Sequence, residues 1–129
     1  MTPELDAIGK SRLGNRARMC KGWRYMPGML LTDGTRLCSY SGRLEWTGIH
    51  DSSKVRVGGG IPDLTDPATL GCLLALVREA WMYPSANVEE MFTRGAGWLA
   101  YTNNEVDRDN RFYGASDAEA LVAALEATP

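Results

Sequence analysis

The stretch from Asp66 to Trp81 constrains the fold more than any other part of this sequence. Asp66 is followed by Pro67, and an N-cap residue with proline at the first helical position is a typical helix start. Apolar residues then recur at the spacing of one helix face, at Leu70, Leu73, Leu74, Val77 and Trp81. We therefore expect a helix that begins at Pro67, ends before Pro84 and buries this face.

A second helix is predicted at the carboxyl end of the chain. Ser116 and Glu119 have the spacing of a capping box, in which each side chain bonds a backbone N–H near the helix start. The buried face of this helix is expected at Ala118, Leu121, Val122 and Leu125.

A third helix is predicted at the amino end, where Thr2 and Pro3 mark its start. Gly9 and Gly14 weaken its continuation, because a glycine costs about 1 kcal/mol inside a helix. We therefore expect residues 1–28 to form a short helix followed by a mobile or partner-ordered basic segment.

Strand patterns fill the intervals between the helices. Asp33-Gly34 is a strong hairpin signal, and a further turn is expected around residues 95–97. Strands are expected at 29–31, 36–40, 44–47, 88–93, 98–102 and 111–113, and residues 55–57 repeat the alternation. This α-βββ-α-βββ-α order predicts an α+β fold, with helices packed on one face of an antiparallel sheet. The length of 129 residues, 44% of them hydrophobic, suits one domain over residues 1–129.

Signatures of catalysis and metal binding are missing from the sequence. Cys20, Cys38 and Cys72 are too far apart for a zinc motif, and the chain has a single histidine, His50. The acidic loop 103–110 lacks the central glycine and final glutamate of an EF-hand, so we expect a solvated loop. The sequence predicts a protein that is not an enzyme, with no catalytic residue, no metal site and no cofactor.

Charge is distributed unevenly along the chain. Residues 1–60 hold ten basic and five acidic residues, a balance of +5, whereas residues 61–129 hold four basic and eleven acidic residues, a balance of −7. Such an asymmetry either creates separate surface fields that steer a charged partner or lets the two halves attract one another.

Membrane insertion and export are not expected. The longest apolar-rich stretch, Leu70 to Val77, is far shorter than the roughly 20 residues of a membrane span. The first residues do not have the pattern of a signal peptide. The sequence therefore predicts a cytoplasmic protein.

The candidate binding site is the basic, aromatic segment near the amino end. Six of the fourteen basic residues fall between Lys10 and Arg24, and aromatic residues stand at the end of this cluster. The predicted partner-binding residues are Arg18, Lys21, Trp23, Arg24 and Tyr25. Cations and exposed rings would suit an acidic protein surface or, as an alternative, the phosphates and bases of a nucleic acid. In a second interpretation, Trp23 packs as a lid over the edge of the sheet.

Three blocks of the sequence carry a resemblance to a known group of proteins. The blocks are Gly22 to Met29, Pro62 to Trp81 and Glu119 to Ala127. They resemble segments of small accessory proteins of tailed phages and prophages, a family without an established activity. The resemblance implies a protein that acts in the host cytoplasm by binding a host protein or complex, for example as an inhibitor of a CRISPR effector. Nucleic-acid binding through the basic segment is the alternative.

Overall fold

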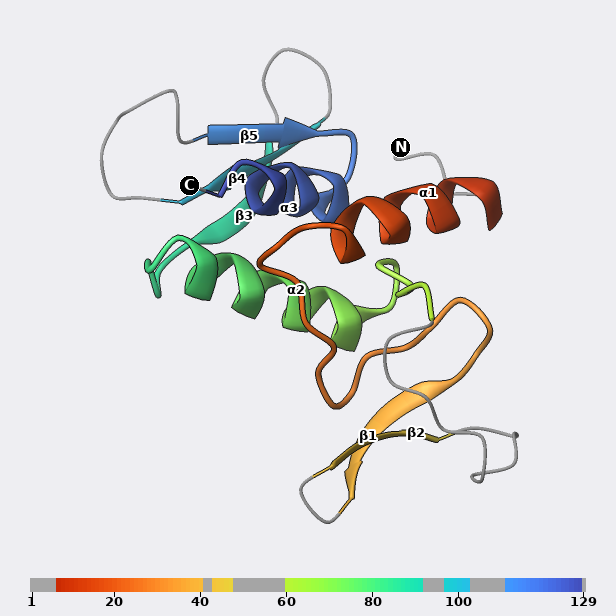
Figure 1. Cartoon of the computed structure of the whole chain (residues 1–129). Helices are drawn as coiled ribbons and strands as arrows, with labels where there is room; N and C mark the ends of the chain where they lie inside the picture. Colours follow the sequence, from red (N-terminus) through yellow and green to blue (C-terminus); the bar gives the residue numbers. More distant parts are fainter. Residues whose placement is uncertain (1–6, 41–42, 48–59, 92–96, 103–110, 129) are drawn as a thin grey trace.

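The computed structural model describes residues 7–40, 43–47, 60–91, 97–102 and 111–128. Its helices are α1 (Ala7–Arg18), α2 (Pro67–Ala80) and α3 (Asp117–Glu126). Its strands are β1 (Arg36–Tyr40), β2 (Arg43–Thr47), β3 (Asn87–Met91), β4 (Gly97–Tyr101) and β5 (Arg111–Gly114) (Figure 1). The predicted α+β fold is confirmed. The expected helix start at Thr2, the alternation at 55–57 and the loop 103–110 lie outside the described residues.

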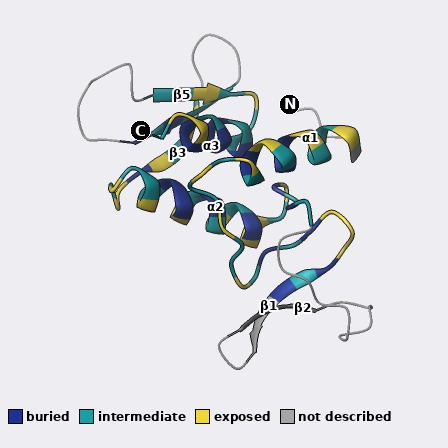
Figure 2. Cartoon of the chain, in the orientation of Figure 1, coloured by how far each residue is buried: buried dark blue, intermediate teal, exposed yellow. Residues whose placement is uncertain are grey.

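Helix α3 is the centre of the fold. It contacts all three strands of the β3–β4–β5 sheet, and it also contacts α1 and α2 (Figure 1). The expected face of α3 is buried, together with Ala120 and Ala124 (Figure 2). Close approach to β5 requires Gly114, because a Cβ there would lie 2.5 Å from the backbone nitrogen of Ala120. Helix α3 therefore covers one face of this sheet, and α1 and α2 pack on α3.

The strands form two separate antiparallel sheets. In the larger sheet, β4 lies between β3 and β5, and Val88 is paired with Ala100, which is paired in turn with Phe112. Among the described residues, the strands before α2 do not join this sheet: β1 pairs with β2, at the end of the molecule away from α3 (Figure 1). The Gly34 turn forms with φ 91°. Residues 29–31 approach β1 through backbone hydrogen bonds and an isolated bridge instead of a continuous strand.

Both predicted helix caps are present. The Asp66 carboxylate accepts a hydrogen bond from the Thr69 N–H, and Ser116 Oγ accepts one from the Glu119 N–H. The Glu119 carboxylate accepts from the N–H of Ala115, one residue before the N-cap. Local hydrogen bonding therefore begins α2 and α3 at the residues that the sequence indicates.

The buried face of α2 differs from the expected one. Thr69, Leu73, Leu76 and Val77 are buried, whereas Leu70 and Leu74 are only partly buried. The face is rotated because α2 packs against two partners, α3 on one side and residues 27–30 on another. Leu76 therefore belongs to the core, and Leu74 lies at its margin.

The amino-terminal prediction is also corrected. The basic residues Lys10, Arg12, Arg16 and Arg18 are part of α1 and do not follow a shorter helix. Leu13 and Ala17 bury one face of α1 in the core. Gly14 allows this packing, because a Cβ at that position would collide with the carbonyl oxygen of Pro62. Burial and close contact thus outweigh the low helix propensity of glycine.

The Asp66 carboxyl links the cap of α2 to β1. Arg36 donates to both carboxylate oxygens, at 3.0 Å and 3.2 Å. The hydrogen bond and charge of Arg36, together with hydrogen bonds from Thr69, lower the pKa of Asp66 below its ordinary value, although partial burial opposes this shift. A carboxyl whose pKa is lowered by folding stabilises the folded state where it is ionised.

We expect acid to remove the stability that this carboxylate supplies. The contribution is fully present above the ordinary pKa of 3.8 and is lost as the pH falls from there through the lower pKa of the folded state. In Asp66→Asn the amide oxygen can still cap the helix, but the ion pair is gone. Urea unfolding of both proteins at several pH values should show a stability gap at neutral pH that closes in acid. A gap of constant size would contradict the role of the Asp66 carboxylate.

Candidate binding surface

The segment that follows α1 lies against the carboxyl ends of α2 and α3. Turns with backbone hydrogen bonds connect Met19 to Asn15, Cys20 to Ala17 and Trp23 to Cys20. At Gly22, a Cβ would lie 3.1 Å from Leu125 and 3.4 Å from Ala80. The segment that carries the predicted binding residues therefore packs against the helical core.

Trp23 and Tyr25 pack within the protein. Both are partly buried against the core, and their rings meet edge to face with centroids 5.7 Å apart. The Tyr25 hydroxyl donates a hydrogen bond to the Gly60 carbonyl, and the Trp23 Nε1 is buried without a hydrogen-bond partner among the described residues. These contacts agree with the interpretation of Trp23 as a packed ring and not as a fully exposed one.

The three predicted cations differ in their surroundings. The Arg24 guanidinium forms an ion pair with Glu79 of α2, in which both side chains are about half exposed (53% and 58%). Arg18 Nε donates to the Asn15 side chain at 2.8 Å. Lys21 is exposed and makes no ion pair with a described residue. Lys21 is therefore the most available of the predicted contacts.

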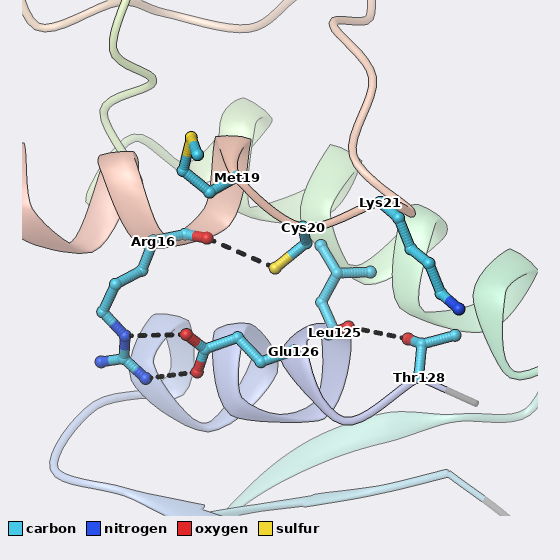
Figure 3. Close-up of a pocket in the computed structure, with 7 residues that line it drawn as sticks. All are labelled: Arg16, Met19, Cys20, Lys21, Leu125, Glu126 and Thr128. Atoms are coloured by element: carbon cyan, nitrogen blue, oxygen red, sulfur yellow. Dashed lines mark hydrogen bonds and ion pairs between the residues drawn. The ribbon is translucent and has the colours of Figure 1, made fainter.

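A pocket of about 260 Å³ lies where the end of α1 meets the end of α3 (Figure 3). We call it the α1–α3 pocket, and it is lined by Arg16, Met19, Cys20, Lys21, Leu125, Glu126 and Thr128. Lys21 is the one residue of the predicted set that lines it. The other four lie elsewhere in the described part of the chain.

The polar groups of the pocket are mostly satisfied. Arg16 binds both oxygens of the Glu126 carboxylate, at 2.7 Å and 3.2 Å (Figure 3). Thr128 Oγ1 donates to the Leu125 carbonyl at 2.8 Å. Burial raises the pKa of the Cys20 thiol, and the nearby Glu126 charge adds to this effect, so the thiol stays protonated at neutral pH.

The pocket offers contact area and charge. Met19 is 80% exposed at its rim, and the Leu125 side chain supplies an apolar wall. A protonated thiol is a poor nucleophile, and Arg16 is already engaged by Glu126. Within the described ranges, no cluster of three or more histidine, cysteine or acidic residues is arranged to hold a metal ion. The arrangement suits an apolar group that enters beside Met19 and an acidic group that meets Lys21.

Sequence reasoning did not identify Arg16, Met19 or Cys20 as parts of one site. Arg16 lies in the last turn of α1, and Met19 directly follows the helix, so their spacing of three residues is a usable signal. Their partners on α3 come from the opposite end of the chain, so the pocket appears only in the folded structure.

Comparisons with models of protein families, with curated proteins and with solved structures found no match. Among the described helices, none is both long enough and apolar enough to cross a membrane. The function of this chain is therefore inferred from the charge, exposure and contacts of the described residues.

Substitutions at Trp23 and Lys21 should separate packing from surface contact. Trp23→Ala removes a ring that is packed on the core and should lower the free energy of unfolding by about 2 to 3 kcal/mol. Lys21→Ala changes an exposed side chain and should alter stability by less than about 0.5 kcal/mol. Thermal and urea unfolding measure both effects. If Trp23→Ala is as stable as the parent, Trp23 does not pack on the core and is instead an exposed residue available for partner contact.

Proposed function

We propose that this chain is a non-catalytic binding protein that docks on an acidic surface of a partner protein through the α1–α3 pocket. The observation that carries the proposal is the pairing of Met19, 80% exposed, with the exposed Lys21 at the rim of one pocket. Methionine is flexible and polarizable, and it is common on binding surfaces that adapt to a partner. An apolar contact beside a cation gives both affinity and a preference for negative charge.

Charge on this surface supports an acidic partner. Arg16 and Lys21 line the pocket, while Glu126 is the one acidic residue among the lining residues. The local balance is positive although the whole chain has a net charge of −2. A positive patch on an acidic protein steers an acidic partner toward that patch.

A protein partner is favoured over a nucleic acid by the positions of the aromatic rings. Non-specific binding to single strands uses exposed rings on which bases stack. Trp23 and Tyr25 pack against the core and against each other, and Arg24 is engaged by Glu79. The surface keeps its cations but has no stacking platform in the described part of the amino-terminal segment.

The resemblance to phage accessory proteins suggests the partner class. On that basis, the proposed partner is a host protein complex in the bacterial cytoplasm, and the proposed action is inhibition of a defence system such as a CRISPR effector. Binding alone is sufficient for such inhibition, because the bound protein occupies a surface that the effector needs for its own ligands.

Binding to a panel of purified CRISPR effectors, measured together with their DNA cleavage, tests the proposal. One effector should bind and lose activity, and Met19→Asp and Lys21→Glu should each weaken that binding about tenfold or more, as for interface contact residues. The matched control is Met82→Asp, which changes a methionine that is 89% exposed outside the pocket. We expect this control to bind as the parent does.

Two results would contradict the proposal. If no effector binds, the assignment to host defence is wrong. If the parent binds nucleic acid with a steep salt dependence, and Met19→Asp has no effect, the nucleic-acid alternative is correct.

A further inference from the structure

The two faces of the β3–β4–β5 sheet carry different sets of residues. Val88, Trp98, Ala100 and Phe112 point to the side covered by α3 and pack on the core. The neighbouring positions along each strand point to the opposite side. The register forms two rows on that outer face, Glu89–Leu99–Tyr113 and Asn87–Tyr101–Arg111, and Met91 lies beyond them.

The outer face is not covered by a described element. Of the helices, α3 makes the extensive contacts with these strands, and α1 and α2 pack on α3 (Figure 1). Tyr113 is 57% exposed, while Leu99 and Tyr101 are partly exposed. A three-stranded sheet therefore presents one face outward.

The composition of this face is typical of a covered surface. An antiparallel sheet with one solvated face usually alternates apolar residues inside with polar residues outside. Here β4 has apolar or aromatic residues on both faces, with Leu99 and Tyr101 on the outer one. Tyrosine, methionine and arginine are also the residue types enriched in protein interfaces. The outer face is thus suited to contact with another protein surface.

The charges at its two edges are complementary. The β3 edge carries the exposed carboxylate of Glu89, and the β5 edge carries Arg111. The Glu89 carboxylate accepts a hydrogen bond from the Tyr101 hydroxyl at 3.3 Å. Neither Glu89 nor Arg111 forms an ion pair with a described residue. One edge is therefore acidic and the opposite edge is basic.

We propose that a second copy of this chain packs on the outer face of the β3–β4–β5 sheet. A two-fold axis parallel to the strands turns the two outer faces toward each other and places β3 of each copy over β5 of its partner. Glu89 and Arg111 stand in adjacent rows, so each Glu89 faces an arginine of the second copy diagonally, within reach across sheets about 10 Å apart. The same symmetry buries Leu99 and Tyr113 at the centre.

The expected pair is weak. Three strands about 4.8 Å apart, of five, five and four residues, form a small face, below the roughly 800 Å² that each partner of a stable complex buries. We therefore expect a dimer with a dissociation constant of about 10 to 100 µM. None of the residues that line the α1–α3 pocket belongs to the sheet, so both pockets stay open in the dimer.

Sedimentation equilibrium of the full chain from about 5 to 500 µM tests this proposal, in the range that a weak interface requires. The parent should change from the monomer mass of 14.1 kDa toward twice that mass as its concentration rises. Tyr113→Asp should abolish the change without altering the unfolding midpoint, because Tyr113 is 57% exposed in the single chain. Met19→Asp is the control, and it should dimerise as the parent does.

A charge swap distinguishes this dimer from other forms of self-association. Glu89→Arg and Arg111→Glu should each weaken dimerisation about tenfold, because each places like charges opposite one another. The double variant restores opposite charges across the interface and should dimerise within about threefold of the parent. A parent that stays monomeric throughout, or a double variant no stronger than the single ones, would overturn the proposal.

Discussion

The carboxylate of Asp66 connects more of this structure than any other single group. It caps α2 through the Thr69 N–H and accepts the Thr69 hydroxyl, which in turn accepts the Leu30 N–H at 2.7 Å. On its other side it binds Arg36, whose guanidinium also donates to the Gly28 carbonyl. The start of α2, the turn before β1 and β1 itself therefore share one hydrogen-bond network. Thr69 is fully buried, so loss of this network would leave polar groups unsatisfied in the interior.

The uneven charge of the sequence is used largely within the molecule. The ion pairs among described residues are Arg16–Glu126, Arg24–Glu79 and Arg36–Asp66, and each joins a cation of the first half to an acid of the second. The two exposed pairs, Arg16–Glu126 and Arg24–Glu79, contribute about 0 to 1 kcal/mol each, so the stability of the fold comes mainly from the core around α3. The pairs instead favour one position of α1 relative to α3, and one position of β1 and of the segment after α1 relative to α2. Lys21 stays outside this pairing, which is why the proposed partner contact centres on it and on Met19.

Features determined by neighbouring residues could be predicted from the sequence, and features determined by distant ones could not. Asp66 and Ser116 cap their helices through residues three positions away, and β3, β4 and β5 lie close to the strand segments expected from the local patterns. The length of α1 depends on the contact of Gly14 with Pro62, and the rotation of α2 depends on residues 27–30. The packing of Trp23 similarly depends on the core formed by α2 and α3. The sequence contains the apolar residues on both faces of β4, but only the position of α3 shows which of the two faces is buried.

The central claim is that α1 and the segment after it are an ordered part of the core in the free protein. Native-state amide hydrogen exchange measures this directly, because exchange rates report the free energy of local opening. Leu13 and Ala17 are buried in α1, and the Leu30 N–H is bonded to the buried Thr69. Their amides should be protected to nearly the same extent as those of Leu121 and Leu125 in α3. Exchange of the Leu13 and Ala17 amides at rates near those of an unfolded chain, while α3 remains protected, would contradict the claim and would mean that the basic segment is mobile until a partner orders it.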